Sequence, residues 1–167
     1  RQFGDRITEW LIRHGLEGTP WCNADVFHKA SIQKTFTSVI AELQQTKLIV
    51  VGPDNLKRLK PILPYVKFVD VPPRNAYLSM ERITRDVLSA VDGLHEHATV
   101  SISAGMPAKL LINELHTRLK GQHTLIDFGS VWDPFVGVTS RKYMRDPEHE
   151  RTVREAISQM SKEEGKA

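Results

Sequence analysis

Residues 99–109 read TVSISAGMPAK, and residues 123–133 read HTLIDFGSVWD. Each segment starts with an apolar, β-branched run that is typical of a buried strand, and each run ends in a glycine turn. Because open α/β sheets bind ligands at the carboxyl ends of their strands, the turns at Gly105 and Gly129 are the first candidates for a ligand site. Pro107 suits the first turn of a helix, which indicates that a helix follows the earlier turn.

The rest of the chain supplies two more strands and a set of helices. Apolar runs predict strands at residues 47–52, 67–71, 99–104 and 123–128. Apolar residues at helical spacing predict helices at residues 5–16, 31–43, 54–63, 79–91, 107–121 and 146–162. We expect residues 19–30 to form a loop with a short strand or turn.

This order of elements predicts the class of fold. Strands that alternate with helices favour right-handed crossovers and a mostly parallel sheet. We therefore predict one α/β, Rossmann-like three-layer domain, which we assign to residues 1–145. Residues 146–167 are expected to form a charged C-terminal helix and tail that pack lightly on the domain or on a partner.

The composition is that of an ordinary globular protein, with 40% apolar and 26% charged residues. No apolar run approaches the ~20 residues that a membrane helix needs. The start of the chain has no signal-peptide pattern, and the single cysteine, Cys22, excludes an intrachain disulfide, so we expect a cytoplasmic protein without a membrane span. Residues 47–85 hold eight Lys or Arg against three Asp or Glu, which suits a phosphorylated ligand or nucleic acid but is also usual for a solvated helix surface.

Small and polar residues follow three of the predicted strands. Gly52 could offer backbone N–H groups to a phosphate together with the helix behind it, although a plain turn explains it as well. Ser103 ends the third strand, Gly105 lets the backbone approach a ligand closely, and Lys109 lies in the first turn of the next helix. The candidate substrate-binding residues at these strand ends are Gly52, Arg74, Asn75, Ser103, Gly105 and Lys109.

A carboxylate ends the fourth predicted strand. Asp127 lies in an otherwise apolar run, and because a buried carboxylate needs a partner we favour a functional role for it. It could act as a base, hold a metal or bind sugar hydroxyls, and we assign it as the catalytic residue. The guanidinium of Arg141 could clamp a phosphate, with a solvated basic loop as the alternative. Ser130, Asp133 and Arg141 complete the candidate substrate-binding residues.

In their order along the chain, these segments resemble glycosyltransferases with the GT-D fold, which are metal-dependent enzymes that use nucleotide-activated sugars. The matching segments, from about Trp21 to Tyr143, are TPWCNADVFHKAS, LIVVGPDNL, VDVPPRNAY, SISAGMPAKLLINEL and TLIDFGSVWDPFVG followed by SRKY. The resemblance implies a domain that binds a nucleoside-diphosphate sugar, with a UDP-sugar as the expected donor. The sugar would pass to an acceptor hydroxyl on a protein, a glycan or modified DNA.

The resemblance also implies a divalent metal, Mn²⁺ or Mg²⁺. In such enzymes an Arg-aromatic-Gly-Asp-Gly-Glu segment near the N-terminus supplies the Asp-x-Glu carboxylates that bind the metal and the donor diphosphate. Here Phe3-Gly4-Asp5 is followed by Ile7 where the glutamate is expected, so we identify no metal ligand in this chain. We expect the metal-binding carboxylates either to lie outside this chain or to be missing from the domain, which leaves catalysis by these residues alone open.

Two other kinds of function stay open at this point. A standard dinucleotide fingerprint is not supported, because no GxGxxG segment occurs. Another Rossmann-like nucleotide-binding enzyme, such as a methyltransferase, is nevertheless compatible with the same strand ends. The alternative outside enzymes is a binding or assembly module, in which the charged helix at 146–162 docks a partner.

Overall fold

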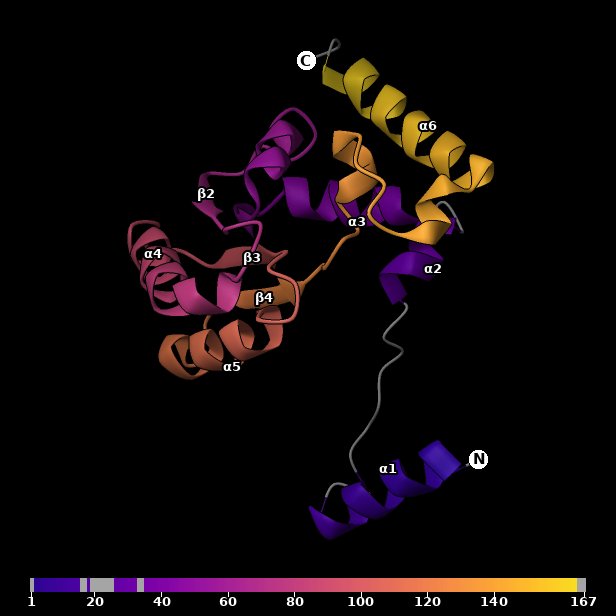
Figure 1. The fold of residues 1–167 in the computed structure, drawn as a ribbon. Helices are drawn as coiled ribbons and strands as arrows, with labels where there is room; N and C mark the ends of the chain where they lie inside the picture. Colours follow the sequence, from indigo (N-terminus) through magenta and orange to yellow (C-terminus); the bar gives the residue numbers. More distant parts are fainter. Residues whose placement is uncertain (1, 16–17, 19–25, 33–34, 165–167) are drawn as a thin grey trace.

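The computed structural model of the chain describes residues 2–15, 18, 26–32 and 35–164, whose arrangement is shown in Figure 1. The described residues form a four-stranded parallel sheet with the strand order β2-β1-β3-β4. The strands are β1 (Lys47–Gly52), β2 (Lys67–Asp70), β3 (Ala98–Ile102) and β4 (Thr124–Asp127). The predicted α/β class and parallel sheet are confirmed, and each strand begins and ends within two residues of its predicted range.

The two central strands are the most deeply buried. Every residue of β3 is buried, and so is every residue of β1 after Lys47. A parallel sheet is covered by helices on both faces, so its central strands read as continuous apolar runs, which explains why these two were predicted well. The edge strands β2 and β4 are only partly covered.

Helices cover the sheet on both faces (Figure 1). On one face α4 (Met80–Asp92) and α5 (Ala108–Leu119) pack Val87 and Leu111 against Val51 and Val100 of the sheet. On the other face α3 (Phe36–Gln44) and α6 (Pro147–Glu164) pack around an aromatic cluster. Its rings are those of Phe36, Phe128, Trp132 and Phe135, with centroids 4.9 to 5.8 Å apart in each contacting pair.

The strand order reverses beside β1. From β1 the chain passes through the 3₁₀ helix η1 (Asp54–Leu59) to β2 on one side, and α4 then carries it back to β3 on the other side. Leu56 of η1, which follows β1, packs in the core of one face, and Leu111 of α5, which follows β3, packs in the core of the other. The loops after β1 and β3 therefore leave the sheet towards opposite faces, and such a switch point opens a crevice at the carboxyl ends of the strands.

The region before β1 differs from the prediction. The chain forms α2 (Val26–Ile32) where a loop over residues 19–30 was expected. Of the single helix predicted over 31–43, the first two residues belong to α2, and α3 begins at Phe36. Residues 19–25 and 33–34 lie outside the described residues. The periodic signal of α2 is weak because the helix depends on tertiary contacts, chiefly the ring of Phe27, whose centroid lies 4.6 Å from that of Phe128.

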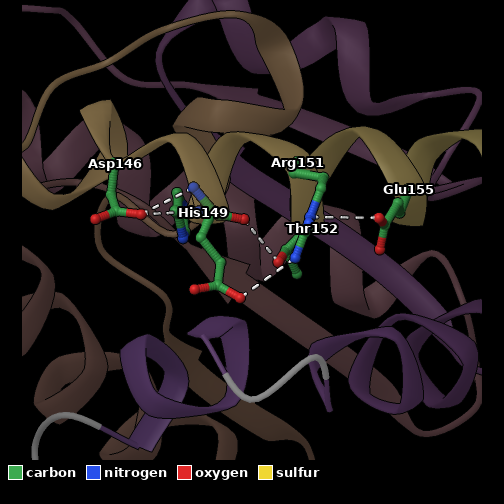
Figure 2. A network of polar contacts seen from close by, with 6 residues as sticks. Asp146, His149, Arg151, Thr152 and Glu155 are labelled. Atoms are coloured by element: carbon green, nitrogen blue, oxygen red, sulfur yellow. Dashed lines mark hydrogen bonds and ion pairs between the residues drawn. The ribbon is translucent and has the colours of Figure 1, made fainter.

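The C-terminal helix packs more closely than expected. Val153 and Ala156 of α6 are buried in the aromatic face of the core, and His149 and Thr152 are buried beside them. Figure 2 shows the polar contacts of the first turns of this helix, where Asp146 accepts hydrogen bonds from the backbone N–H groups of Glu148 and His149. Asp146 thus caps α6 and satisfies N–H groups that the helix cannot pair itself.

The remaining helices differ from prediction mainly in their ends. The helix α1 spans Gln2–Arg13, and the predicted helix over 54–63 is the shorter 3₁₀ helix η1. Further 3₁₀ helices are η2 (Ala76–Ser79), η3 (Asp133–Val136) and η4 (Lys142–Arg145). Within the described part of the chain, no helix combines the length and the apolar content that crossing a membrane requires.

Candidate functional site

A crevice opens at the switch point, at the carboxyl ends of β1, β2 and β3. It has a volume of about 500 Å³, which lies within the range of small-molecule sites. We call it the switch-point crevice. Its walls come from three loops: Pro53 after β1, residues 71–73 and 75–77 after β2, and residues 103–107 after β3. Of the sequence-predicted residues, Asn75, Ser103 and Gly105 line it.

Ser103 is the one buried polar residue in this wall. Its backbone N–H donates to the carbonyl of Val51 at 2.8 Å, which continues the β1–β3 ladder beyond the end of β3. The residue is only 8% exposed, and its Oγ has no hydrogen-bond partner among the described residues. A buried hydroxyl without a partner costs about 1–3 kcal/mol. Such groups are rare in folded proteins, and a role in ligand binding is one explanation for them.

The two glycines of the site are required for different reasons. A Cβ at Gly52 would lie 2.7 Å from Cδ1 of the buried Leu56 and 3.5 Å from Cβ of Ser103, so this position has no room for a side chain. A Cβ at Gly105 would meet nothing within 4 Å, but the residue has a φ of +66°, which L side chains rarely adopt. Gly105 therefore permits the turn from β3 into α5, while Gly52 permits close packing below Ser103.

The loop after β2 contributes Asn75 but not Arg74 to the crevice. Asn75 has a left-handed backbone conformation, with a φ of 52°, and its carbonyl accepts a hydrogen bond from the N–H of Leu78 at 2.9 Å. Asparagine tolerates this conformation better than most residues. Arg74 is exposed and is not among the residues that line the crevice.

Asp127 and Lys109 form an ion pair at the end of β4. Nζ of Lys109 lies 3.7 Å from Oδ2 of Asp127, and Oδ1 accepts a hydrogen bond of 2.9 Å from the N–H of Gly129. The Asp127 side chain is 26% exposed, whereas that of Lys109 is 83% exposed. Asp127 thus closes the glycine turn after β4, and neither residue lines the switch-point crevice.

The other three predicted residues lie together in the loops after β4. The Arg141 guanidinium donates from Nε to Oγ of Ser130 at 3.3 Å, and the Ser140 hydroxyl donates to Oδ2 of Asp133. Burial raises the pKa of Asp133, while the hydrogen bond from Ser140 and the positive charge of Arg141 act in the opposite direction. These contacts join the turn at 130–133 to the loop at 140–141.

Apart from Arg74, the predicted residues therefore fall into two groups, the second of which also includes Ser140, the partner of Asp133. One belongs to the switch-point crevice, with Gly52 packed directly behind Ser103. The second, which we call the β4 cluster, consists of Lys109, Asp127, Ser130, Asp133, Ser140 and Arg141. Sequence reasoning did not select Tyr77 and Met106, which line the crevice although both are largely exposed. The position of Tyr77 two residues after Asn75, in the loop that follows a strand, was the available signal.

The described residues do not fit the divalent metal that the resemblance implies. No group of three His, Cys, Asp or Glu side chains among them could hold a metal ion. The two candidate carboxylates at the end of β4 and in the loop behind it, Asp127 and Asp133, already have partners within the described residues.

Comparisons of the chain with protein-family models, with curated proteins and with solved structures find no match. The case for a function consequently rests on the geometry of the strand ends and on the chemistry of the residues that surround them.

Proposed function

We propose that this chain is a glycosyltransferase-like domain that binds a nucleoside-diphosphate sugar at the switch-point crevice and transfers the sugar to an acceptor hydroxyl. The observation that carries the proposal is the buried, unpartnered hydroxyl of Ser103 in a crevice at the switch point of a parallel sheet. Ligands of open α/β sheets bind in this position. A ligand that bonded to Ser103 would remove the cost of its missing partner.

The beginning of α5 supplies positive charge for the diphosphate. Gly105 turns the chain into this helix and accepts a hydrogen bond of 3.0 Å from the N–H of Ala108, the first residue of α5. The other N–H groups of a helix's first turn have no partners within the helix. Lys109 lies in the same turn, and its ammonium is largely free in water because its single ion pair, with Asp127, is long. The negative charge that develops on the leaving diphosphate would be stabilised by these groups.

The transfer exchanges one bond at the anomeric carbon for another. The bond from this carbon to the diphosphate oxygen breaks as the acceptor oxygen attaches to the carbon, and the diphosphate leaves with the bonding electron pair. The acceptor hydroxyl proton must go to a base, and Asp127, the carboxylate that ends β4 and pairs with Lys109, is the residue we assign to this role.

Thermal unfolding with a panel of ligands tests this proposal. The panel contains UDP, CDP, GDP and ADP, the UDP-sugars, S-adenosylmethionine and pyrophosphate, each with and without Mn²⁺. A nucleoside diphosphate or its sugar at 100 times its Kd should stabilise the protein by roughly 2.7 kcal/mol, seen as a rise in the melting temperature. Pyrophosphate at the same concentration controls for a purely ionic effect.

The pattern of melting-temperature shifts across the panel distinguishes the candidate functions. No shift with any nucleoside diphosphate or nucleotide sugar contradicts the glycosyltransferase proposal. A shift with S-adenosylmethionine alone would instead favour a methyltransferase, and no shift with any ligand would favour a binding or assembly module.

A further inference from the structure

Two large apolar side chains stand exposed at the mouth of the switch-point crevice. Tyr77 is 64% exposed and Met106 is 92% exposed, and both line the hollow. Tyr77 also lines a separate groove between α4 and α5, so its ring lies at the border of two depressions. Exposed apolar groups beside a hollow are characteristic of binding sites.

Prolines make up much of the remaining wall. Pro53, Pro72, Pro73 and Pro107 all line the crevice, and a proline has no backbone N–H to donate. This part of the crevice therefore cannot bind phosphate oxygens through its backbone as the beginning of α5 can. It offers flat, apolar surfaces, which suit a planar group better than a charged one.

The polar groups of the crevice are few and uncharged. Its polar side-chain groups are the Ser103 hydroxyl, the side-chain amide of Asn75 and the phenol hydroxyl of Tyr77. The Ser103 hydroxyl is buried without a partner, and no side-chain bond of Asn75 caps the helix that follows it. An amide can both donate and accept, and a hydroxyl can do the same. Such groups match the edge of a nucleobase, which carries donors and acceptors around an apolar ring.

We propose that the switch-point crevice is the nucleobase subsite, where the base stacks on the Tyr77 ring between the proline-rich walls. Asn75 and Ser103 then meet the polar atoms of the nucleoside, and the phosphates extend towards the beginning of α5 and Lys109. This inference rests on the proposed function, because it assigns parts of the donor to parts of that site. In this assignment Tyr77 contributes to the affinity for the base and does not bind phosphate.

The test compares UDP with inorganic pyrophosphate by titration calorimetry on the full chain. The variants are Tyr77→Leu, which removes the aromatic face but keeps a bulky apolar side chain, and Tyr77→Phe, which keeps the face. Stacking of one base on an aromatic side chain is worth about 1–3 kcal/mol, so Tyr77→Leu should weaken UDP binding about tenfold. Tyr77→Phe should retain the affinity for UDP, and both variants should bind pyrophosphate like the original protein.

Leu78→Ala is the matched control. Leu78 is 82% exposed beside Tyr77 and lines the α4–α5 groove but not the crevice, so its loss should leave UDP binding unchanged. An unchanged UDP affinity in Tyr77→Leu, or an equal loss of pyrophosphate affinity, would overturn the base assignment but not the proposed function. If the original protein binds no nucleoside diphosphate, the base assignment fails together with the proposed function.

Discussion

The switch-point crevice and the β4 cluster both lie at the carboxyl ends of the strands, yet their polar groups differ in one respect. In the β4 cluster each polar side chain has a partner within the chain: Asp127 with Lys109, Ser130 with Arg141, and Asp133 with Ser140. In the crevice the Ser103 hydroxyl is buried without one. The short contacts of Ser130, Asp133 and Arg141 hold the loops after β4 in place, whereas the long ion pair of Lys109 and the missing partner of Ser103 leave these two groups available to a ligand.

The surroundings of the two regions support this distinction. The loop after β4 is anchored by Trp132, which is fully buried among aromatic rings and donates from Nε1 to Oγ of Ser101 at 3.0 Å. The crevice is instead walled by prolines, glycine and exposed apolar side chains. In the β4 cluster, Ser130, Asp133, Ser140 and Arg141 thus join the loops that follow the strand, while Lys109 and Asp127 lie at the strand end, so changes in the two regions should have different consequences.

The largest effect is expected where the β4 loop meets the core. Trp132→Ala removes a fully buried ring and leaves the Ser101 hydroxyl without its donor, so the free energy of unfolding should fall by about 3–5 kcal/mol. Urea denaturation measures this change. A loss below about 1 kcal/mol would show that Trp132 does not anchor the loop, because large-to-small changes in a packed core cost more.

A smaller, pH-dependent effect is expected at Asp133. Because burial raises the pKa of this carboxyl above its ordinary value of 3.8, its stabilising contribution is complete below about pH 3.8 and is lost as the pH rises through the raised pKa. Asp133→Asn keeps an acceptor for Ser140 and removes the ionisation. The variant should therefore gain stability relative to the original protein as the pH rises from 3.8 towards neutral.

Urea denaturation at several pH values checks this prediction, with Asp54→Asn, at an exposed carboxyl of η1, as the control. A relative stability of Asp133→Asn that falls over the same pH range would contradict the assignment. UDP binding should not change in Asp133→Asn, since Asp133 does not line the crevice.

The positions of the four strands were predictable from the sequence because the signal of a buried strand is local. The runs at 47–52 and 98–102 consist mainly of apolar and small residues and are buried at every position after Lys47, as a strand covered on both faces requires. The helix α2 was not predictable, since it is only seven residues long and Phe27 gains its partner, Phe128, from a distant part of the chain. Tertiary contacts of this kind override a weak local preference.

The candidate site was predictable only in part, for the same reason. Glycine turns after buried strands correctly directed attention to Ser103 and Gly105 as residues at one strand end. The pairing of Ser130 with Arg141 depends on the path of the loop over Trp132, and no spacing in the sequence encodes that path. Whether the Ser103 hydroxyl has a partner likewise depends on everything packed around it.

The most direct measurement of the central claim is the stability of Ser103→Ala with and without UDP. Without ligand, the variant should be as stable as the original protein or up to about 1 kcal/mol more stable, because a buried hydroxyl without a partner is removed. With UDP, the stabilisation should be smaller than that of the original protein by about 1 kcal/mol, since one hydrogen bond to the ligand is lost. A variant that is less stable without ligand and is stabilised by UDP as much as the original protein would contradict the account.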